Sequence, residues 1–345
     1  MPKMDSSEGK AASQKIRVGI NGFGRIGRTL FRLLLDHPHI EVVAINDLAP
    51  SATLAHLLKY DSIHGVLKRA VSEENSAIVV DTKTFPVMNQ ANPKDIGWSN
   101  HKVDIVVEST GKFKTRPQLE PHLQKGVQKV ILSVPPQDDS IKMVVLGVNE
   151  KILDGSEDIV SNASCTTNNA APMLQVIKEL CGIKQASITT IHSYTTDQSL
   201  HDQPHKDLRR SRAAAQSIVP TTTGAAKALT KIFPELSDVI GGCGIRVPVA
   251  NGSLTDMTLH VKKPVSVEQI NTAFKEAAAT SLHNYLEYTE DPIVSIDIIG
   301  NSHSCIFDAQ MTSVVDENLV KVIGWYDNEV GYSSRLVDLI SLVGR

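Results

Sequence analysis

The first half of the chain alternates short apolar runs with segments of helical periodicity. The runs are rich in Val and Ile and predict strands over residues 16–21, 41–47, 103–110, 129–134, 143–148 and 158–164. Between the first two runs, residues 28–37 carry apolar side chains at helical spacing. Continuous apolar strands separated by helices are typical of a parallel sheet covered on both faces, so this half predicts an α/β domain.

The pattern changes after Cys165. Residues 170–182 predict an amphipathic helix that ends at Gly182, and the strands that follow are longer and alternate apolar with polar positions. Such alternation indicates one solvated face, which is typical of an antiparallel or mixed sheet backed by helices such as the one predicted over 265–282. The second half therefore predicts an α+β domain.

These patterns divide the chain into domains and terminal segments. We expect a first domain over residues 16–164, a second over 165–328 and a flexible polar tail over 1–15. A C-terminal helix within 329–345 could cover either domain, and we place it on the first. The basic stretch 195–220 lacks periodicity, and loops of that length in a compact domain are commonly functional or form interfaces.

Composition narrows the classes of protein. The 345 residues include 35 Lys and Arg against 38 Asp and Glu, a net charge of −3, so no basic field favours nucleic acid as a partner. No apolar run reaches the ~18 residues that a membrane-spanning helix needs, so we expect no membrane partner either. Four cysteines without C-x-x-C spacing are too few for a disulfide scaffold, which favours a reducing, cytoplasmic setting.

A glycine motif follows the first predicted strand. Gly22, Gly24 and Gly27 form G-x-G-x-x-G between a strand and a helix, the context in which this motif binds a dinucleotide. Asp47 ends the second predicted strand, 20 residues after Gly27, where its carboxylate would accept ribose hydroxyls and repel a 2′-phosphate. The set favours NAD over NADP. The alternative is an ordinary glycine turn with Asp47 as a strand-end cap.

Cys165 lies where a predicted strand turns into a helix. At a helix N-terminus the macrodipole favours a thiolate, which makes Cys165 a candidate nucleophile. His192, in the next predicted strand, is the best-placed proton acceptor. Taken alone, each residue has a simpler alternative, because a buried free cysteine commonly acts as a small hydrophobe and a strand histidine as a hydrogen-bonded core residue.

Three segments of the second half could bind anions. Residues 221–224 (TTTG) precede a predicted helix and offer hydroxyls and N–H groups to a phosphate, or form an ordinary N-cap. Arg246 lies in an apolar strand and requires either a carboxylate partner or a substrate phosphate. The run 209–212 (RRSR) could be a solvated loop, a subunit contact or an anion site. The His and Asp residues of the polar loop lie on no evident helix face, so we expect no metal site.

Taken together, nine motifs resemble phosphorylating NAD-dependent glyceraldehyde-3-phosphate dehydrogenase. They occur in order between residues 16 and 342 and read INGFGRIGR, LKYDSIHG, ESTGKF, SNASCTTN, HSYTTDQ, PHKDLRR, SIVPTTTGAAKALTK, RVP and WYDNEVGYSSR. SNASCTTN surrounds the nucleophile in that family. The resemblance implies an oxidoreductase of glycolysis or gluconeogenesis, with a Rossmann-type NAD-binding domain, a catalytic domain and a C-terminal helix.

The implied reaction is the oxidation of D-glyceraldehyde 3-phosphate to 1,3-bisphosphoglycerate with NAD and inorganic phosphate. By resemblance, Cys165 is the nucleophile and His192 the general base. The implied NAD site comprises Gly22, Phe23, Gly24, Arg25, Ile26, Gly27, Asp47, Ser109, Thr110, Ser133 and Asn328, the last on the nicotinamide carboxamide. The implied phosphate-binding residues are Ser164, Thr166, Thr195, Asp197, Arg210, Thr223, Gly224 and Arg246.

The resemblance also implies a homotetramer, in which the loop around 193–212 reaches a neighbouring subunit's cofactor site. Two alternatives stay open. Erythrose-4-phosphate dehydrogenase shares much of the motif set, but an enzyme that uses water as its second nucleophile has less need of the phosphate-binding residues. A non-catalytic binding protein could keep the fold, although the Cys165 and His192 pair and the charge of −3 count against it.

Overall fold

The computed structural model describes residues 15–344, so the expected N-terminal tail lies outside the described residues except for Lys15. The helices are α1 (Arg25–Leu34), α2 (Ser51–Lys59), α3 (Arg116–Leu119), α4 (Cys165–Cys181), α5 (Ala225–Ile232), α6 (Val267–Ala279) and α7 (Val330–Val343). Strands β1 to β9 are Ile16–Asn21, Ile40–Asn46, Val71–Glu74, Ala77–Val80, Lys83–Met88, Ile105–Glu108, Lys129–Leu132, Lys142–Met143 and Ile159–Ser161. Strands β10 to β17 are Ile183–Ser193, Val219–Thr221, Ile240–Val247, Ser253–Val261, Leu286–Thr289, Cys305–Asp308, Ser313–Val315 and Leu319–Tyr326.

The first sheet has nine strands in the order β3-β4-β5-β2-β1-β6-β7-β9-β8. All neighbouring strands from β5 to β8 in this order are parallel, whereas β3, β4 and β5 pair antiparallel. The central strand β1 has β2 on one side and β6 on the other, so the chain reverses its winding there. A crevice forms at the carboxyl ends of the strands at such a point, and it is the usual place for a ligand.

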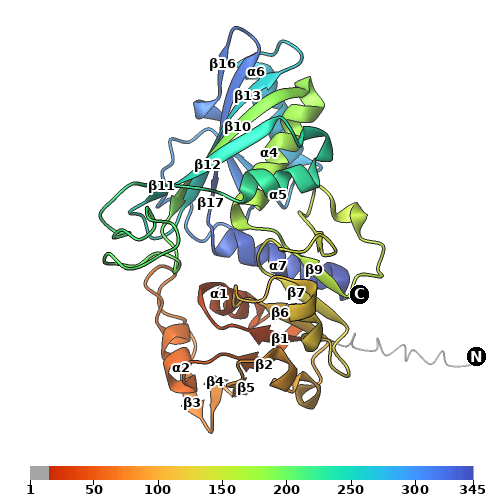
Figure 1. Cartoon of the computed structure of the whole chain (residues 1–345), viewed down its shortest axis with the longest axis vertical. Coiled ribbons are helices and arrows are strands. Elements are labelled where there is room, and N and C mark those ends of the chain that lie inside the picture. Colours follow the sequence, from red (N-terminus) through yellow and green to blue (C-terminus); the bar gives the residue numbers. More distant parts are fainter. Residues whose placement is uncertain (1–14, 345) are drawn as a thin grey trace, which may run out of the picture.

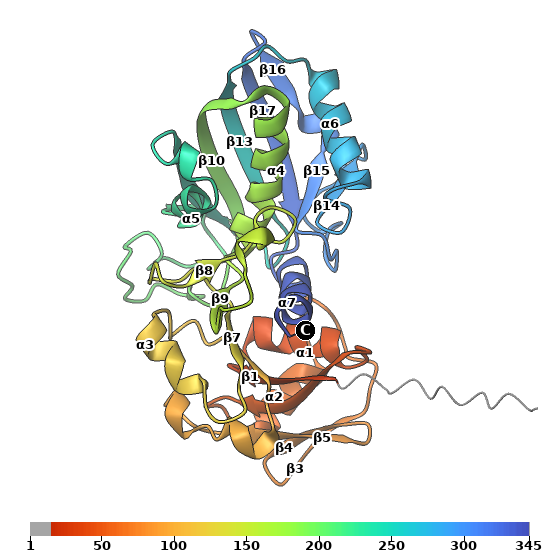
Figure 2. The same ribbon diagram turned by 90° about the vertical axis from the view of Figure 1, so that its right-hand side faces the viewer.

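The second sheet is mixed, as the alternating pattern predicted. Its main path is β11-β12-β10-β13-β17-β15-β14, with β16 paired to β17. β10 pairs parallel with β12 and antiparallel with β13. Helices α4 and α6 lie against one face of this sheet and bury an apolar core with it (Figure 2). The expected fold class, a Rossmann-type parallel sheet followed by an α+β domain and a C-terminal helix, is confirmed.

Helix α7 lies between the two sheets (Figure 1). Its residues Leu336, Leu339 and Ile340 are buried in the same apolar core as β1 and α1. On the other side, Nη1 of Arg335 donates to the carbonyl oxygen of Asn284 over 2.7 Å. One helix therefore packs in the first domain's core and contacts the second domain.

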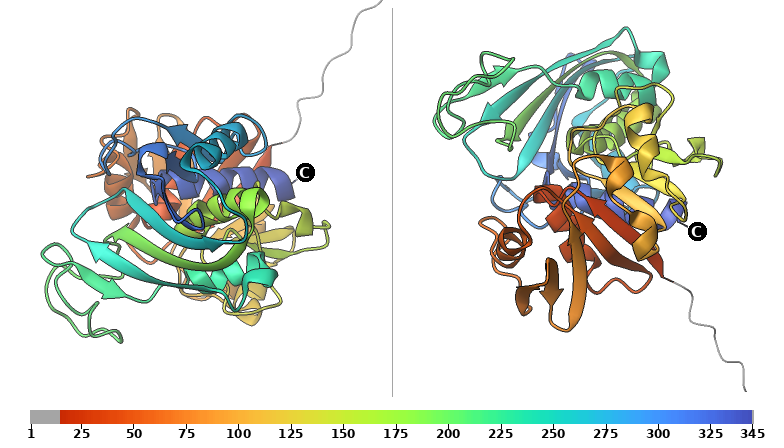
Figure 3. Two further views of the ribbon diagram at one scale, coloured as in Figure 1. Left: turned by 90° about the horizontal axis from the view of Figure 1, so that it is seen from above. Right: turned by 60° about the horizontal axis from the view of Figure 1, so that its bottom comes forward.

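Residues 194–218, between β10 and β11, contain no helix or strand. This segment projects from the second domain at the left edge of both views in Figure 3. It exposes large apolar side chains, among them Leu200, Leu208 and Ile218. Within residues 15–344, no helix is both long and apolar enough to cross a membrane.

Candidate active site

The turn after β1 forms one wall of a cleft. Gly22 has a φ of +92°, and a Cβ there would lie 2.7 Å from the backbone nitrogen of Thr110. A Cβ on Gly27 would lie 2.1 Å from the carbonyl oxygen of Gly22, so the turn requires glycine at both positions. A Cβ on Gly24 would meet nothing within 4 Å, and α1 begins beside it without a side-chain cap. Open space beside uncapped N–H groups fits a pyrophosphate.

A cavity of about 350 Å³ occupies this part of the cleft. Seven of the residues implied for NAD line it, namely Gly22, Gly24, Arg25, Ile26, Asp47, Ser109 and Thr110. The Asp47 carboxylate accepts the N–H groups of Phe23 and Ala49 over 2.7 and 2.9 Å, which fixes it at the end of β2. The side chain of Phe23 is fully buried against Phe31, so only its backbone lies toward the cleft.

Cys165 is the first residue of α4. Between β9 and this helix, Ala163 adopts a φ of +55°, and Ser164 caps the helix by accepting the N–H of Thr167 over 3.1 Å. Burial raises the pKa of the Cys165 thiol, while the charge of Arg246 and the N–H group of Thr166 oppose that rise. Burial thus outweighs the expected preference for thiolate at the helix terminus, because loss of hydration destabilises the charged form.

His192 faces the cysteine from β10. Its Nε2 lies 3.5 Å from Sγ of Cys165, and its Nδ1 lies 2.8 Å from the carbonyl oxygen of Ser193. Burial lowers the pKa of His192 to about 3, and the charge of Arg246 acts in the same direction. The ring is therefore neutral near pH 7, and a neutral imidazole can accept a proton.

Arg246 lies beside His192 because β12 pairs with β10 and brings the two residues into register. Its Nη1 lies 2.6 Å from Nδ1 of His192 and 3.0 Å from the carbonyl oxygen of Ser193. Both of these contacts are with uncharged groups, so they do not provide the carboxylate partner considered above. A half-buried guanidinium held by neutral groups is suited to bind an anion.

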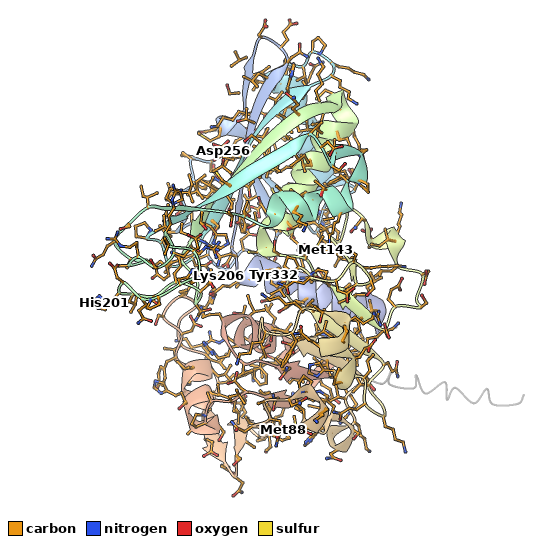
Figure 4. All side chains as sticks on the ribbon, in the orientation of Figure 1. Met88, Met143, His201, Lys206, Asp256 and Tyr332 are labelled. Carbon is orange, nitrogen blue, oxygen red and sulfur yellow. The ribbon has the colours of Figure 1, made fainter. Side chains whose placement is uncertain are left out.

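These residues surround a second cavity of about 440 Å³. It is lined by nine of the residues singled out from the sequence, namely Arg25, Ile26, Ser133, Ser164, Cys165, His192, Thr195, Arg246 and Asn328. Tyr332 of α7 also lines it, and Figure 4 shows this residue between the two domains. Arg25, Ile26 and Thr196 line both cavities, so the dinucleotide cleft adjoins the cysteine and histidine.

Five residues implied for phosphate binding lie outside this lining. Thr166 is buried, and its hydroxyl lies 2.9 Å from that of Tyr326. Asp197 pairs with Nη1 of Arg210 over 2.6 Å. Thr223 and Gly224 directly precede α5, where the hydroxyl of Thr223 accepts the N–H of Ala225 over 3.2 Å. The structure therefore pairs Asp197 and Arg210 with each other, and the start of α5 is a separate candidate anion subsite.

Sequence reasoning missed Tyr326. Its fully buried hydroxyl lies 2.9 Å from both the Thr166 and Thr190 hydroxyls, and its ring meets that of His192 edge-on, with 5.9 Å between ring centroids. Tyr326 thereby supports the His192 ring. These contacts join residues of β17, α4 and β10, which lie far apart in the sequence, so no residue spacing predicts them. Only the motif WYDNE could have drawn attention to Tyr326.

An acidic and basic cluster beside the cleft was also missed. Arg25 binds Asp61 over 2.6 Å and Glu329 over 2.8 Å, and Nε2 of His64 lies 2.7 Å from Glu329. The cluster ties the start of α1 to the loop after α2 and to the start of α7. Its members occur in three of the quoted motifs, but their sequence separation hides the contacts.

Fold and site together define an NAD-dependent dehydrogenase in which a dinucleotide cleft ends at a cysteine and a histidine. The family models for the NAD binding domain and the C-terminal domain of glyceraldehyde 3-phosphate dehydrogenase match residues 16–116 and 164–328. The chain belongs to the glyceraldehyde-3-phosphate dehydrogenase family.

Individual relatives are similar over nearly their whole length. The chain is 54% identical to glyceraldehyde-3-phosphate dehydrogenase 2 of Streptomyces avermitilis, covering 95% of this chain and 98% of the relative. It is 51% identical to glyceraldehyde-3-phosphate dehydrogenase 1 of Bacillus cereus, covering 94% and 97%. It is 50% identical to glyceraldehyde-3-phosphate dehydrogenase of Geobacillus stearothermophilus, covering 95% and 98%.

Proposed function

We propose that this protein oxidises D-glyceraldehyde 3-phosphate to 1,3-bisphosphoglycerate with NAD and inorganic phosphate. The observation that carries the proposal is the 3.5 Å approach of Cys165 Sγ to His192 Nε2 in a cavity that adjoins the dinucleotide cleft. The relatives carry the name of this activity, and their similarity to the chain spans both domains.

The first half of the reaction uses the cysteine and histidine. Sγ of Cys165 attacks the aldehyde carbon, and Nε2 of His192 takes the thiol proton and returns it to the carbonyl oxygen, giving a hemithioacetal. N–H groups at the start of α4 hold the developing oxyanion. The turn after β1 and Asn328 would hold NAD, which would supply the hydride acceptor. His192 takes the hydroxyl proton as the hemithioacetal becomes a thioester on Cys165.

The second half uses the anion subsites. Inorganic phosphate attacks the thioester carbon, the C–S bond breaks, and Cys165 leaves as a thiolate while the acyl phosphate forms. Arg246 lies beside Cys165 and His192, where its guanidinium binds a phosphate and stabilises the thiolate. The hydroxyl of Thr223 and the start of α5 supply further donors to an anion.

We place the enzyme in the cytoplasm as a homotetramer. The apolar side chains exposed on residues 194–218 support a subunit contact there, because Leu208 leaves 82% of its surface in solvent in the single chain. Arg210, which pairs with Asp197, lies on the same segment. Light scattering coupled to size-exclusion chromatography measures the assembly directly, and a monomer at micromolar concentration would contradict the tetramer.

The activity is tested by following NADH absorbance with purified protein, NAD, phosphate and D-glyceraldehyde 3-phosphate. Steady production that requires phosphate supports the proposal. Cys165→Ser should bind NAD yet form no NADH, whereas Cys243→Ser, which alters an exposed thiol, should keep full activity. A higher kcat/KM for D-erythrose 4-phosphate, or no burst of NADH at all, would contradict it.

A further inference from the structure

Two buried serines contact the side chain of Asn328. Ser193 and Ser253 are 0% and 1% exposed. Ser193 Oγ donates to Oδ1 of Asn328 over 2.8 Å, and Ser253 Oγ donates to the same oxygen over 3.0 Å. The N–H of Ser193 in turn donates to Ser253 Oγ over 3.1 Å. The three residues come from the ends of β10, β13 and β17, and Asn328 lines the cavity that contains Cys165.

The hydroxyl protons decide which way the Asn328 amide points. With Oδ1 toward the serines, both hydroxyl protons have an acceptor, and Ser253 Oγ also accepts a backbone proton. With the amide turned over, its NH₂ group would face the two hydroxyls and remove the acceptor that they share. Ser253 Oγ could then donate to Ser193 Oγ, 3.4 Å away, but the proton of Ser193 Oγ would lose its acceptor. In a site this buried, an unpaired hydroxyl proton is costly. The serine pair therefore holds Oδ1 inward and leaves the NH₂ group of Asn328 facing the cavity.

We infer that Ser193 and Ser253 are positioning residues that fix Asn328 as a hydrogen-bond donor toward the cofactor. A fixed donor selects a ligand group that accepts, which on a nicotinamide is the carboxamide oxygen and not its NH₂ group. The inference rests on the proposed function, in that NAD binds with its nicotinamide beside Cys165. The serine pair would thus explain why the carboxamide of NAD takes a single orientation in this cleft.

Ser193 also serves the proposed base. Its carbonyl oxygen lies 2.8 Å from Nδ1 of His192, while its hydroxyl donates to Oδ1 of Asn328. A single residue at the end of β10 thus orients the imidazole through its backbone and the cofactor-binding amide through its side chain. Replacing the side chain leaves the carbonyl contact in place, so the two roles are separable by mutation.

The test compares two dinucleotides by calorimetric titration. The probes are NAD and 3-acetylpyridine adenine dinucleotide, which keeps the carbonyl oxygen but lacks the NH₂ group. In Ser193→Ala/Ser253→Ala the amide is free to turn its oxygen outward, and only NAD can donate to that oxygen. We expect the ratio of the analogue's Kd to that of NAD to rise by about two- to tenfold over wild type. Asn328→Asp, which offers acceptors alone, should raise the ratio at least as much.

Single variants and a matched control complete the experiment. Ser193→Ala and Ser253→Ala each retain one donor and should give intermediate ratios, which keeps the test decisive if the double variant does not fold. Ser333→Ala removes an equally buried hydroxyl, one without a hydrogen-bond partner in the described part of the chain, and should leave the ratio at its wild-type value. If the serine variants bind both dinucleotides tightly and the ratio of the two Kd values stays at its wild-type value, the positioning role of the serines is overturned, while the proposed function stands. Binding of neither by the wild type overturns the proposed function and this inference with it.

Discussion

Nη1 of Arg246 lies 2.6 Å from Nδ1 of His192. The same ring nitrogen lies 2.8 Å from the carbonyl oxygen of Ser193. The two contacts select opposite tautomers. Donation to the carbonyl leaves Nε2 as a base toward Cys165, whereas acceptance from Arg246 places the ring proton on Nε2. An anion bound by the guanidinium would compete with the ring for it, which would link anion binding to the basicity of Nε2.

Arg246→Ala should slow alkylation of Cys165 by iodoacetamide at pH 7 by about tenfold. Burial raises the pKa of the thiol and the Arg246 charge opposes that rise. Loss of the charge should raise the pKa of the thiol further, so the thiolate fraction at pH 7 should fall. The rate is measured from pH 6 to 10 in a Cys243→Ser background, with peptide mapping to locate the label.

A matched control for Arg246→Ala is available on the basic loop. Arg209 is exposed there, so Arg209→Ala removes the same charge outside the cavity and should leave the alkylation profile unchanged. A profile for Arg246→Ala that superimposes on that of the wild type would show that this guanidinium does not influence the thiol.

His192→Asn should lower kcat by about 10²–10⁴, the range for loss of a general acid–base group. Asparagine can still form hydrogen bonds beside Cys165 but cannot accept a proton, so the loss should appear in the burst of NADH formation and not in the Kd for NAD. Exposed His283 provides the control, and His283→Asn should react at the wild-type rate. Retention of more than a tenth of the activity by His192→Asn would assign the proton transfer to another group.

The features that the sequence predicts well are local. The φ of +92° at Gly22 and the 2.1 Å approach of a Cβ on Gly27 to the carbonyl oxygen of Gly22 both arise within a turn of six residues. The position of Cys165 at a helix start is equally local. Motif membership does not reveal where a side chain points, however, and Phe23, inside the glycine motif, packs into the domain core against Phe31.

Long-range effects account for what the sequence could not supply. The thiol of Cys165 is affected more by burial than by its helix terminus, and burial depends on how the domains close over it. Asp197 and Arg210 both resemble phosphate ligands by motif, yet their side chains form an ion pair with each other. Strand register in the second sheet places Arg246 beside His192, whereas the pair of Asp197 and Arg210 forms within the segment 194–218.

Asp47→Ala should raise kcat/KM for NADP relative to NAD by about tenfold. The carboxylate is held at the end of β2 by two backbone N–H groups, so in the wild type it would meet a 2′-phosphate with like charge. Asp95→Ala removes the same charge from an exposed residue outside the cleft lining and should keep the wild-type preference. An unchanged ratio in Asp47→Ala would mean that another residue sets cofactor choice.

Asp61 should make the stability of the protein depend on pH in the acid range. Burial raises the pKa of Asp61, but the guanidinium of Arg25 and the N–H groups of Ile63 and His64 outweigh it and lower the pKa to about 2. An unfolded aspartate titrates near pH ~3.9. Because the folded pKa is the lower one, the stabilisation is complete above the unfolded pKa and is lost as the pH falls through the folded pKa.

Asp61→Asn should therefore lower the free energy of unfolding at pH 7 by about 1–2 kcal/mol, after allowance for solvent screening. Urea unfolding at pH 7, 5 and 3 measures the effect as the difference between wild-type and variant midpoints. That difference should be largest at pH 7 and fall by about half at pH 3, where the wild-type carboxylate has lost part of its advantage. Asp36→Asn, which removes a surface partner of Arg69, should change the midpoint little at any of these pH values. If the difference between the wild-type and Asp61→Asn unfolding midpoints grows as the pH falls, the pH dependence derived from the Arg25–Asp61 ion pair is wrong. The acid sensitivity would then belong to other groups.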